Sequence, residues 1–435
     1  MAQQKLRFQA LTWVVISLMV KGTNIKIHSP YMNRSLFFLK GGLPALLFFT
    51  LSCAKPSSHP APGGSSVAAD TLPLPNTVIK TDTLKVMAYN VLSYGDDCQG
   101  LPGNLDGYFK TIIQYAAPDL LSCEKMDAFP TTPGAAYNLA DEITDSVLNA
   151  VFTGRYAYCT PTDVSNADNM STLFYDKQKL TYVRTETLVA DITDFDLYKL
   201  YYNDINLSIT HDTTFLYVVV NHTQSGSSST SRDQQVTQEM QTLRSKFGYF
   251  PNLIDMGDFN TASSLEAGYQ AVITSTDSAT VMNDPPYYPD KAIQYPGNWD
   301  VSPYQVLPYL TTSTRLSASI PNSCGTSGGA KGWYDHIIIS PWLVNGNNYI
   351  QYIPHSYQTI GNDGNRLGVD INSPTPVVNA SAPAAVINAL FQFSNKYPVS
   401  IQLSVKANRN ANSPVDPVEE NKVDRYVTLH ILLQS

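Results

Sequence analysis

Residues 252–260 read NLIDMGDFN, an apolar run that closes on Gly257-Asp258-Phe259-Asn260. The apolar part has the length of a buried β-strand and is too short for an ordinary helix. In α/β proteins, functional side chains gather where such strands end. The segment therefore predicts a buried strand that delivers a carboxylate, Asp258, and a carboxamide, Asn260, to a site.

Four further segments also place polar side chains at an end of an apolar run. Helical spacing of apolar residues over 105–116, 139–151 and 236–247 separates them, and alternating or apolar runs near 180–190 and 399–405 predict further strands. This mixture predicts an α/β protein. The four segments are Met87-Ala88-Tyr89-Asn90, Leu121-Ser122-Cys123-Glu124, Val219-Val220-Asn221-His222 and Tyr334-Asp335-His336-Ile337.

In this order, the five segments resemble the endonuclease/exonuclease/phosphatase superfamily, which includes the deoxyribonuclease-I-like nucleases. The resemblance spans about residues 83–404. It implies a four-layer α/β sandwich, in which two mixed β-sheets are flanked by helices. It also implies a metal-dependent hydrolase of phosphate esters, with DNA, RNA, phospholipid headgroups and sugar phosphates all open as substrates.

The resemblance assigns the metal to the first two segments. Glu124 would be the principal ligand of Mg²⁺ or Mn²⁺, and Asn90 would support it through its carboxamide. Hard oxygen donors suit these cations, which neutralise the phosphate and stabilise the leaving oxygen. The alternatives are that Glu124 pairs with Lys125 or another cation, and that Asn90 caps a turn.

The resemblance assigns the chemistry to the other three segments. His222 would donate to a non-bridging phosphate oxygen, Asp258 would activate the attacking water, and Asn260 would contact the phosphate. Asp335 would hold a second histidine in one tautomer. Alternatively, His222 is a core histidine, and Asn260 and Asp335 are turn residues.

The family normally closes with Ser-Asp-His-x-Pro-Val, whereas this chain has Ser394-Asn395-Lys396-Tyr397-Pro398-Val399. Asn395 stands where the family has a metal-side carboxylate, and Lys396 stands where it has the histidine. We expect Lys396 to contact Asp335 and hold it ionised, as a cation that cannot act as a base at neutral pH. A second hypothesis follows, in which the chain binds a phosphorylated or polyanionic ligand without turnover.

Two further residues are candidates for substrate contact. Asn169 precedes a predicted strand, and Arg232 follows a serine-rich loop. The alternatives are a turn for Asn169 and a helix N-terminal surface position for Arg232. Residues 274–334 lack periodicity and are rich in aromatic side chains, so we expect a long loop region that borders the site.

Composition limits the partners. The 435 residues include 28 basic and 36 acidic side chains, for a net charge of −8. Stable nucleic-acid binding by phosphate neutralisation therefore has no strong electrostatic basis. We expect a monomer that takes one phosphate ester at a time.

The N-terminal region carries targeting signals. Residues 32–53 have a basic start, a short apolar core and a terminal Cys53, which resembles a bacterial lipoprotein signal peptide. We expect acylation at Cys53 and export, either anchored to the membrane or secreted. Residues 1–31 are interpreted as an over-long gene start or a short anchor, and 54–80 as a flexible linker. Residues 81–405 form the expected domain, and 406–435 a linker with an extra edge strand.

Overall fold

The computed structural model describes residues 19–20, 23–24, 74, 76–96, 100–131, 136–294, 297–318 and 325–410. Cys53 and the expected edge strand after residue 410 lie outside these residues. The chain divides into two units, Met1–Lys55 and Pro56–Ser435. In the first, β1 (Met19–Val20) pairs with β2 (Thr23–Asn24). Across the described residues, no helix has the length and apolarity needed to cross a membrane.

The second unit contains two mixed β-sheets. In the larger sheet the order is β12-β14-β3-β4-β6-β5, with β13 also paired to β14, and in the smaller sheet it is β11-β10-β9-β8-β7. The pairs β3–β4 and β9–β10 are parallel, and the other pairs are antiparallel. The larger sheet consists of β3 (Thr81–Tyr94), β4 (Leu120–Asp127), β5 (Tyr156–Tyr158), β6 (Asn169–Asp176), β12 (Ile350–Tyr352), β13 (Gln358–Thr359) and β14 (Val399–Lys406). The smaller sheet consists of β7 (Leu180–Ala190), β8 (Asp194–Tyr202), β9 (Phe215–His222), β10 (Leu253–Asp258) and β11 (Asp335–Ile339).

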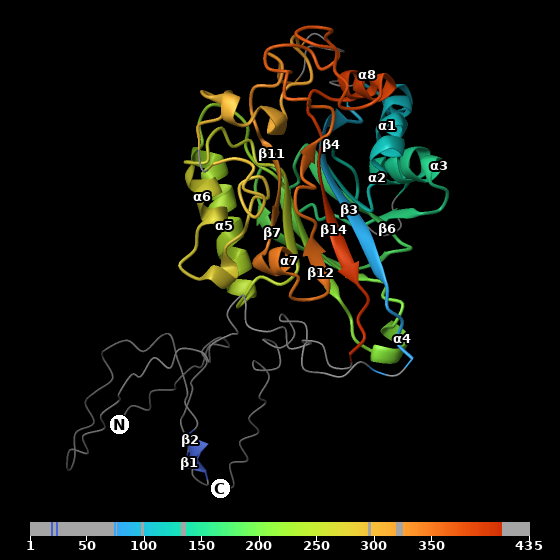
Figure 1. Ribbon diagram of the computed structural model, residues 1–435, viewed down its shortest axis with the longest axis vertical. Coiled ribbons are helices and arrows are strands. Elements are labelled where there is room, and N and C mark those ends of the chain that lie inside the picture. Colours follow the sequence, from blue (N-terminus) through green and yellow to red (C-terminus); the bar gives the residue numbers. More distant parts are fainter. Residues whose placement is uncertain are drawn as a thin grey trace, which may run out of the picture. The chain divides into compact units, whose positions relative to one another are not determined.

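Helices cover the outer faces of both sheets (Figure 1). On the larger sheet lie α1 (Pro102–Ala116), α8 (Ala384–Phe393) and the continuous run of α2 (Leu139–Glu142), a π-helix (Ile143–Leu148) and α3 (Asn149–Val151). On the smaller sheet lie α5 (Thr230–Lys246) and α6 (Ala267–Ile273). The expected four-layer sandwich is confirmed. Two short helices, α4 (Leu207–Thr210) and α7 (Pro341–Asn345), and three 3₁₀ turns at Ser278–Thr280, Pro303–Gln305 and Leu307–Tyr309 complete the described elements.

The apolar spacing seen in the sequence explains how the outer helices pack. Leu105, Phe109, Ile112 and Ile113 of α1 are buried in the main core, and Phe109 stacks on Phe393 of α8 with ring centroids 4.4 Å apart. A second core lies between the smaller sheet and α5 and α6. The two cores fill the layers between the sheets and the helices. The polar side chains at the strand ends lie outside these cores and are available to form a site.

The chain enters and leaves this domain at one place. The Asn206 side chain accepts from Val78 N at 2.7 Å and donates to Val78 O and Asn408 O, both at 2.8 Å. The first pair of the β3–β14 ladder is Thr81 with Lys406. Thr81 precedes Asn90 by nine residues along β3, which is roughly 30 Å of strand. Entry and exit therefore lie at the far end of the sheet from Asn90.

Candidate functional site

Each sheet delivers predicted site residues in adjacent strands. In the smaller sheet, Asp258 of β10 is the register partner of His222 in β9 and of Asp335 in β11. In the larger sheet, Asn90 of β3 is the register partner of Glu124 in β4. Neighbouring strands lie about 4.8 Å apart. Two short rows of polar residues are therefore formed, one on each sheet.

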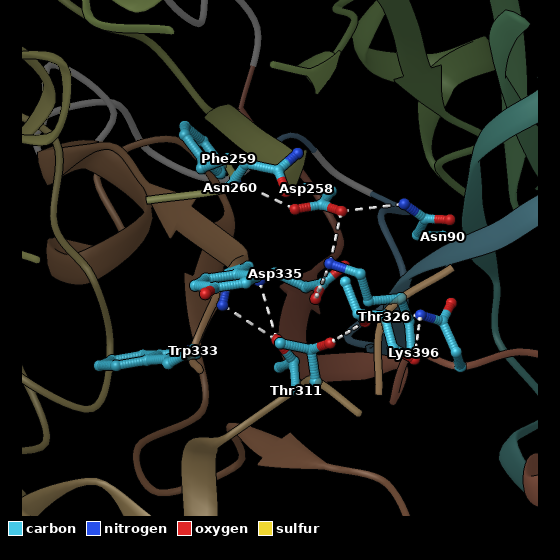
Figure 2. A network of polar contacts seen from close by, with 12 residues as sticks. Asn90, Asp258, Phe259, Asn260, Thr311, Thr326, Trp333, Asp335 and Lys396 are labelled. Carbon is cyan, nitrogen blue, oxygen red and sulfur yellow. Dashed lines mark hydrogen bonds and ion pairs between the residues drawn. The ribbon is translucent and has the colours of Figure 1, made fainter. Parts of the chain in front are cut away.

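Hydrogen bonds across the interior join the two rows (Figure 2). Asn90 Nδ2 donates to Asp258 Oδ2 at 2.9 Å, and Lys396 Nζ donates to the same oxygen at 2.7 Å. Ser394 Oγ donates to the Asn90 carbonyl at 2.8 Å, which ties the Ser394–Val399 segment to β3. The structure thus brings together the residues from all six motif segments, in what we call the carboxylate cluster: Asn90, Glu124, His222, Asp258, Asn260, Asp335, Asn395 and Lys396.

Asp258 is the ionised member of the cluster. Burial alone would raise its pKa, but the Lys396 ammonium, His222 and the hydrogen bonds from Lys396 and the Asn260 backbone lower the pKa to about 2. The pKa of Lys396 is raised, because Asp258 and Asp335 outweigh the effect of its own burial. The two residues form a buried ion pair with a direct hydrogen bond.

The expected ion pair of Lys396 with Asp335 is present, but the hydrogen bond of the Lys396 ammonium goes to Asp258. Lys396 Nζ lies 3.8 Å from Asp335 Oδ2, against 2.7 Å from Asp258 Oδ2. Neither Asp335 side-chain oxygen has a hydrogen-bond partner, and only the Asp335 backbone is held, by Thr311 Oγ1 at 3.1 Å. Burial, opposed by Lys396 and reinforced by Asp258, raises the pKa of Asp335 to about 8. Asp335 is therefore mostly protonated at neutral pH rather than ionised as expected.

Glu124 is a fully buried carboxyl with one oxygen free. Its Oε1 accepts a short hydrogen bond from Ser122 Oγ, and its Oε2 has no partner. Burial, with the charges of Asp335 and Asp258, raises its pKa well above the usual range. No ion pair joins Glu124 to Lys125, so the alternative reading of Glu124 is not supported.

The fit of a metal ion can be judged from unpartnered oxygens. Glu124 Oε2 and Asn395 Oδ1 are buried without donors, and both are hard oxygen ligands on residues predicted to face the metal. Among the described residues, no group of three or more His, Cys, Asp or Glu side chains is placed to hold a metal. Mg²⁺ commonly takes one or two carboxylates, with water and substrate phosphate filling the other positions. These oxygens therefore fit a Mg²⁺ site with few protein ligands, and they do not fit a site formed by protein side chains alone.

His222 and Asn260 lie at the partly exposed side of the cluster. Burial lowers the pKa of His222 to about 4, and Lys125 and Lys396 add to this effect while Asp258 opposes it. His222 is therefore a neutral imidazole at pH 7 and keeps one N–H to donate. Asn260 Nδ2 donates to Thr223 O at 2.9 Å, so one of its two amide hydrogens is already used by the loop.

Three residues at or just after the motif residues have a backbone in the left-handed region. Leu92, Lys125 and Asn260 have φ of 52°, 58° and 46°. The register of β3–β4 shifts between Asn90 and Tyr94, and that of β4–β6 shifts between Cys123 and Met126. Bulges of this kind next to active sites redirect side chains, and a non-glycine residue in this region costs about 1–2 kcal/mol. Part of the backbone strain of the described residues therefore lies where the sheets deliver the cluster.

Two contacts of the cluster were missed from the sequence. Ser122 lies two residues before Glu124, and the period of two along a strand places both side chains on one face. Thr326 accepts from Asn395 Nδ2 at 2.6 Å, a contact that no local pattern signals. Lys125 also borders the cluster, although the sequence suggested it only as an ion-pair partner of Glu124.

The two substrate-contact candidates lie outside the cluster. Arg232 is buried in the first turn of α5, where Nε and Nη2 donate to the Glu266 carboxylate at 2.6 Å and Nη1 donates to Gly226 O and Ser228 O at 2.8 Å. These donors are used by Glu266 and by the loop before α5, and no described contact joins Arg232 to the cluster, so its role in substrate contact stays a prediction. Asn169 begins β6 opposite Asp127, and the described residues show no contact of it with the cluster, so its role stays a prediction.

Comparison with known proteins gives similarity at the level of structure. No family model and no curated protein matches the chain. An endonuclease/exonuclease/phosphatase family protein from Bacteroides thetaiotaomicron is 14% identical, with 75% of this chain and 99% of that chain covered and a TM-score of 0.43. A mannosyl-6-phosphatase from the same organism is 14% identical, with 74% and 99% covered and a TM-score of 0.42.

The catalytic domain of human Nocturnin is also 14% identical, with 75% of this chain and 97% of that chain covered and a TM-score of 0.43. A further similar structure, from Bacteroides vulgatus, again bears the name endonuclease/exonuclease/phosphatase. The solved structures to which this chain is similar thus include proteins of the endonuclease/exonuclease/phosphatase family.

Proposed function

We propose that this protein hydrolyses phosphate esters at the carboxylate cluster, with Mg²⁺ or Mn²⁺ as cofactor. The observation that carries the proposal is the Asn90–Asp258 hydrogen bond of 2.9 Å. It joins the polar ends of two sheets whose residues are separated by 168 positions in the chain. Such convergence at strand ends, together with the order of the motifs, favours a shared phosphate site over independent structural roles.

Glu124, with the carboxamides of Asn90 and Asn395, would hold the metal. When bound, it would neutralise phosphate charge and stabilise the leaving oxygen. Neutral His222 would donate its N–H to a non-bridging phosphate oxygen. Asp258, with a pKa of about 2, is too weak a base to take a proton at neutral pH, so it would orient the attacking water. Asp335 carries a proton at neutral pH and could supply it to the leaving group.

Hydrolysis of bis-p-nitrophenyl phosphate, p-nitrophenyl phosphate and plasmid DNA by the full chain tests the proposal. Activity is expected with Mg²⁺ or Mn²⁺ and lost with a chelator. Glu124→Ala should reduce it by at least about 100-fold, while Lys177→Met, an exposed lysine in the β6–β7 turn, should not change it. The absence of turnover of all three substrates with either metal would contradict hydrolysis.

A second candidate function, binding of a phosphorylated or polyanionic ligand without turnover, is favoured by one contact. Lys396 Nζ, Asn90 Nδ2 and the Asn260 backbone together occupy both oxygens of Asp258. A carboxylate so occupied has little capacity left for a water molecule. Binding of inorganic phosphate without hydrolysis of any of the esters would favour this second function.

We further propose that the protein is exported as a monomer and anchored through acylated Cys53. The basic and apolar residues before Cys53 support this. Labelling with a palmitate analogue should mark the wild type and not Cys53→Ala. Equal labelling of the two would refute the anchor. Light scattering of the purified chain, with the mass of one copy expected, tests the monomer.

A further inference from the structure

The outer face of the larger sheet, which faces away from the carboxylate cluster, is only partly covered by helices. Side chains alternate along a strand, so Asn90, which reaches the smaller sheet, places Lys85 and Tyr89 of β3 on the opposite face. Tyr89 packs against Phe109 of α1 and Phe393 of α8. Lys85, four residues earlier on the same face, is exposed. The helices therefore cover this face near Tyr89 and leave it open near Lys85.

The open part of this face is hollowed by two adjoining cavities. One, of about 240 Å³, is lined by Lys85, by its register partner Gln402 in β14, and by Tyr115 near the end of α1. The other has a volume of about 210 Å³, and Tyr115 and Gln358 line both. Sites for small molecules typically have volumes of about 300–1,000 Å³, which the two cavities reach together. We call the pair of cavities the outer groove.

The outer groove offers hydrogen-bonding groups that the protein itself does not use. Within the described residues, the side chains of Gln358, Ser400 and Gln402 make no hydrogen bond, and neither does the hydroxyl of Tyr309. Amide and hydroxyl groups of this kind both donate and accept hydrogen bonds. Among the described residues that line the groove, Lys85 is the only one with a charged side chain. The groove is therefore suited to a neutral ligand with several hydroxyl groups.

Tyrosine rings form part of the walls. Tyr309 is held against Trp333 and Tyr357, with ring centroids 5.6 Å and 5.9 Å apart. The Tyr115 hydroxyl donates to Ser381 O at 3.4 Å, which joins α1 to the segment before α8. A tyrosine ring presents an apolar face and a polar edge. A sugar ring has the matching chemistry, with apolar C–H groups on its faces and hydroxyl groups around its edge.

We propose that the outer groove binds a neutral oligosaccharide, independently of the phosphate chemistry at the carboxylate cluster. Strands β3 and β14 are each paired on both sides, so the groove offers no free strand edge to an extended peptide. A nucleic acid would need several positive charges, and Lys85 supplies one. A lipid chain would need apolar walls where the groove has Ser400 and Gln402. The two adjoining cavities suit more than one sugar unit.

Calorimetric titration of the full chain with maltohexaose, cellohexaose and mannohexaose tests the inference. The wild type should bind at least one of them. Tyr115→Ala should weaken that binding by about tenfold, and Gln358→Ala by about 3- to 10-fold, through the loss of ring contact and of hydrogen bonds. Tyr115→Phe keeps the ring and should stay within about threefold of the wild type. Tyr304→Ala, the control, removes an exposed ring outside the groove and should bind as the wild type does.

Thermal unfolding checks that each variant is folded. The failure of the wild type to bind any of the three oligosaccharides would overturn the inference, while leaving the proposed function intact. Equal affinity of the wild type and a folded variant that combines Tyr115→Ala with Gln358→Ala would also overturn it. Binding of adenosine, with no oligosaccharide bound, would assign the groove to another class of ligand and contradict the inference. Oligosaccharide binding that is weakened in the variants, with no hydrolysis under any condition, would support the groove and contradict the proposed hydrolase.

Discussion

Strand β10 carries two buried carboxylates, Asp255 and Asp258. Asp258 has a cation as counterion, and Asp255 has none in contact. An odd separation along a strand sends them to opposite faces of the sheet. Asp255 accepts from Asn221 Nδ2 at 2.8 Å and lies against the buried Glu239 of α5, with no cation in contact. Asp258 faces the other sheet and is bonded to Lys396.

The two positions have similar burial, but their pKa values are shifted in opposite directions. Burial raises the pKa of Asp255 to about 7, and burial with the Asp255 charge raises the pKa of Glu239 as well. The pKa of Asp258 is lowered to about 2. Burial therefore favours the protonated forms of Asp255 and Glu239, whereas the Lys396 ammonium favours the ionised form of Asp258. The comparison indicates that Lys396 is the group that keeps Asp258 ionised.

The largest expected effect comes from exchanging the ammonium beside Asp258 for an imidazole. Asn395→Asp combined with Lys396→His restores a metal-side carboxylate and a group that can exchange a proton at neutral pH. Phosphodiesterase activity should rise by about 10²-fold or more, and metal affinity should rise with it. Steady-state kinetics and metal titration measure both quantities. A double variant no faster than an active wild type would show that the site works without that histidine.

Removing the ammonium without replacement should destabilise the fold. Lys396→Met leaves Asp258 buried beside Asp335 without its hydrogen-bonded cation, which should lower the free energy of unfolding by about 3–5 kcal/mol at pH 7. Denaturant unfolding measures the loss. Adding Asp258→Asn to Lys396→Met should recover part of it, since the uncompensated charge is then gone. A loss below about 1 kcal/mol would contradict the role of Lys396 as counterion.

The Asp255–Glu239 pair has no cation in contact, so removing one of its carboxyls should raise the free energy of unfolding, whereas Lys396→Met lowers it. Glu239 and Asp255 have folded pKa values above their unfolded ones, so the folded state retains protons and loses stability as pH rises from about 4 toward 7. Glu239→Gln removes this cost and should stabilise the protein by on the order of 1–2 kcal/mol at pH 7. The gain should vanish below about pH 4.

Thermal unfolding at pH 4, 5.5 and 7 tests this sign, with Asp163→Asn as the control because Asp163 is exposed. A Glu239→Gln variant that loses stability as steeply as the wild type when the pH rises would contradict the raised pKa of Glu239.

The smallest effect concerns Glu124, a buried carboxyl held by a hydroxyl alone. Ser122→Ala removes the hydrogen bond to Glu124 Oε1 and should cost about 1 kcal/mol of stability. Ser171→Ala is the matched control, because the buried Ser171 Oγ has no partner. Chemical unfolding of the two variants gives the difference. Equal stabilities would mean that the Ser122 contact contributes nothing.

Sequence patterns predicted the elements whose periodicity is strong. The strands that carry Asn90, Glu124, His222 and Asp258 follow from apolar runs closed by polar residues. The patterns missed β8 and α8. Strand β8 is buried along nearly its whole length, so it lacks the alternation that marks a half-exposed strand. Helix α8 begins after Pro383 without a side-chain cap.

The errors at the site came from contacts that local sequence does not encode. Which carboxylate Lys396 meets depends on how the two sheets are packed, and the spacing of its own segment does not reveal it. Arg232 was placed correctly near a helix start, but its partner Glu266 is 34 residues away. The protonation of Asp335 depends on burial, which only the packed structure determines.

The Asn206 contacts have a practical consequence for engineering. They hold the segments around Val78 and Asn408 side by side, at the end of the larger sheet remote from Asn90. Two segments that lie side by side where the chain enters and leaves the sheets are the usual condition for circular permutation and for insertion of one domain into another. A short peptide joining these two segments should therefore permit new ends in the exposed serine loop at 225–229. A fluorescent protein or a surface attached through residues 74–80 would leave the end of the larger sheet near Asn90 uncovered.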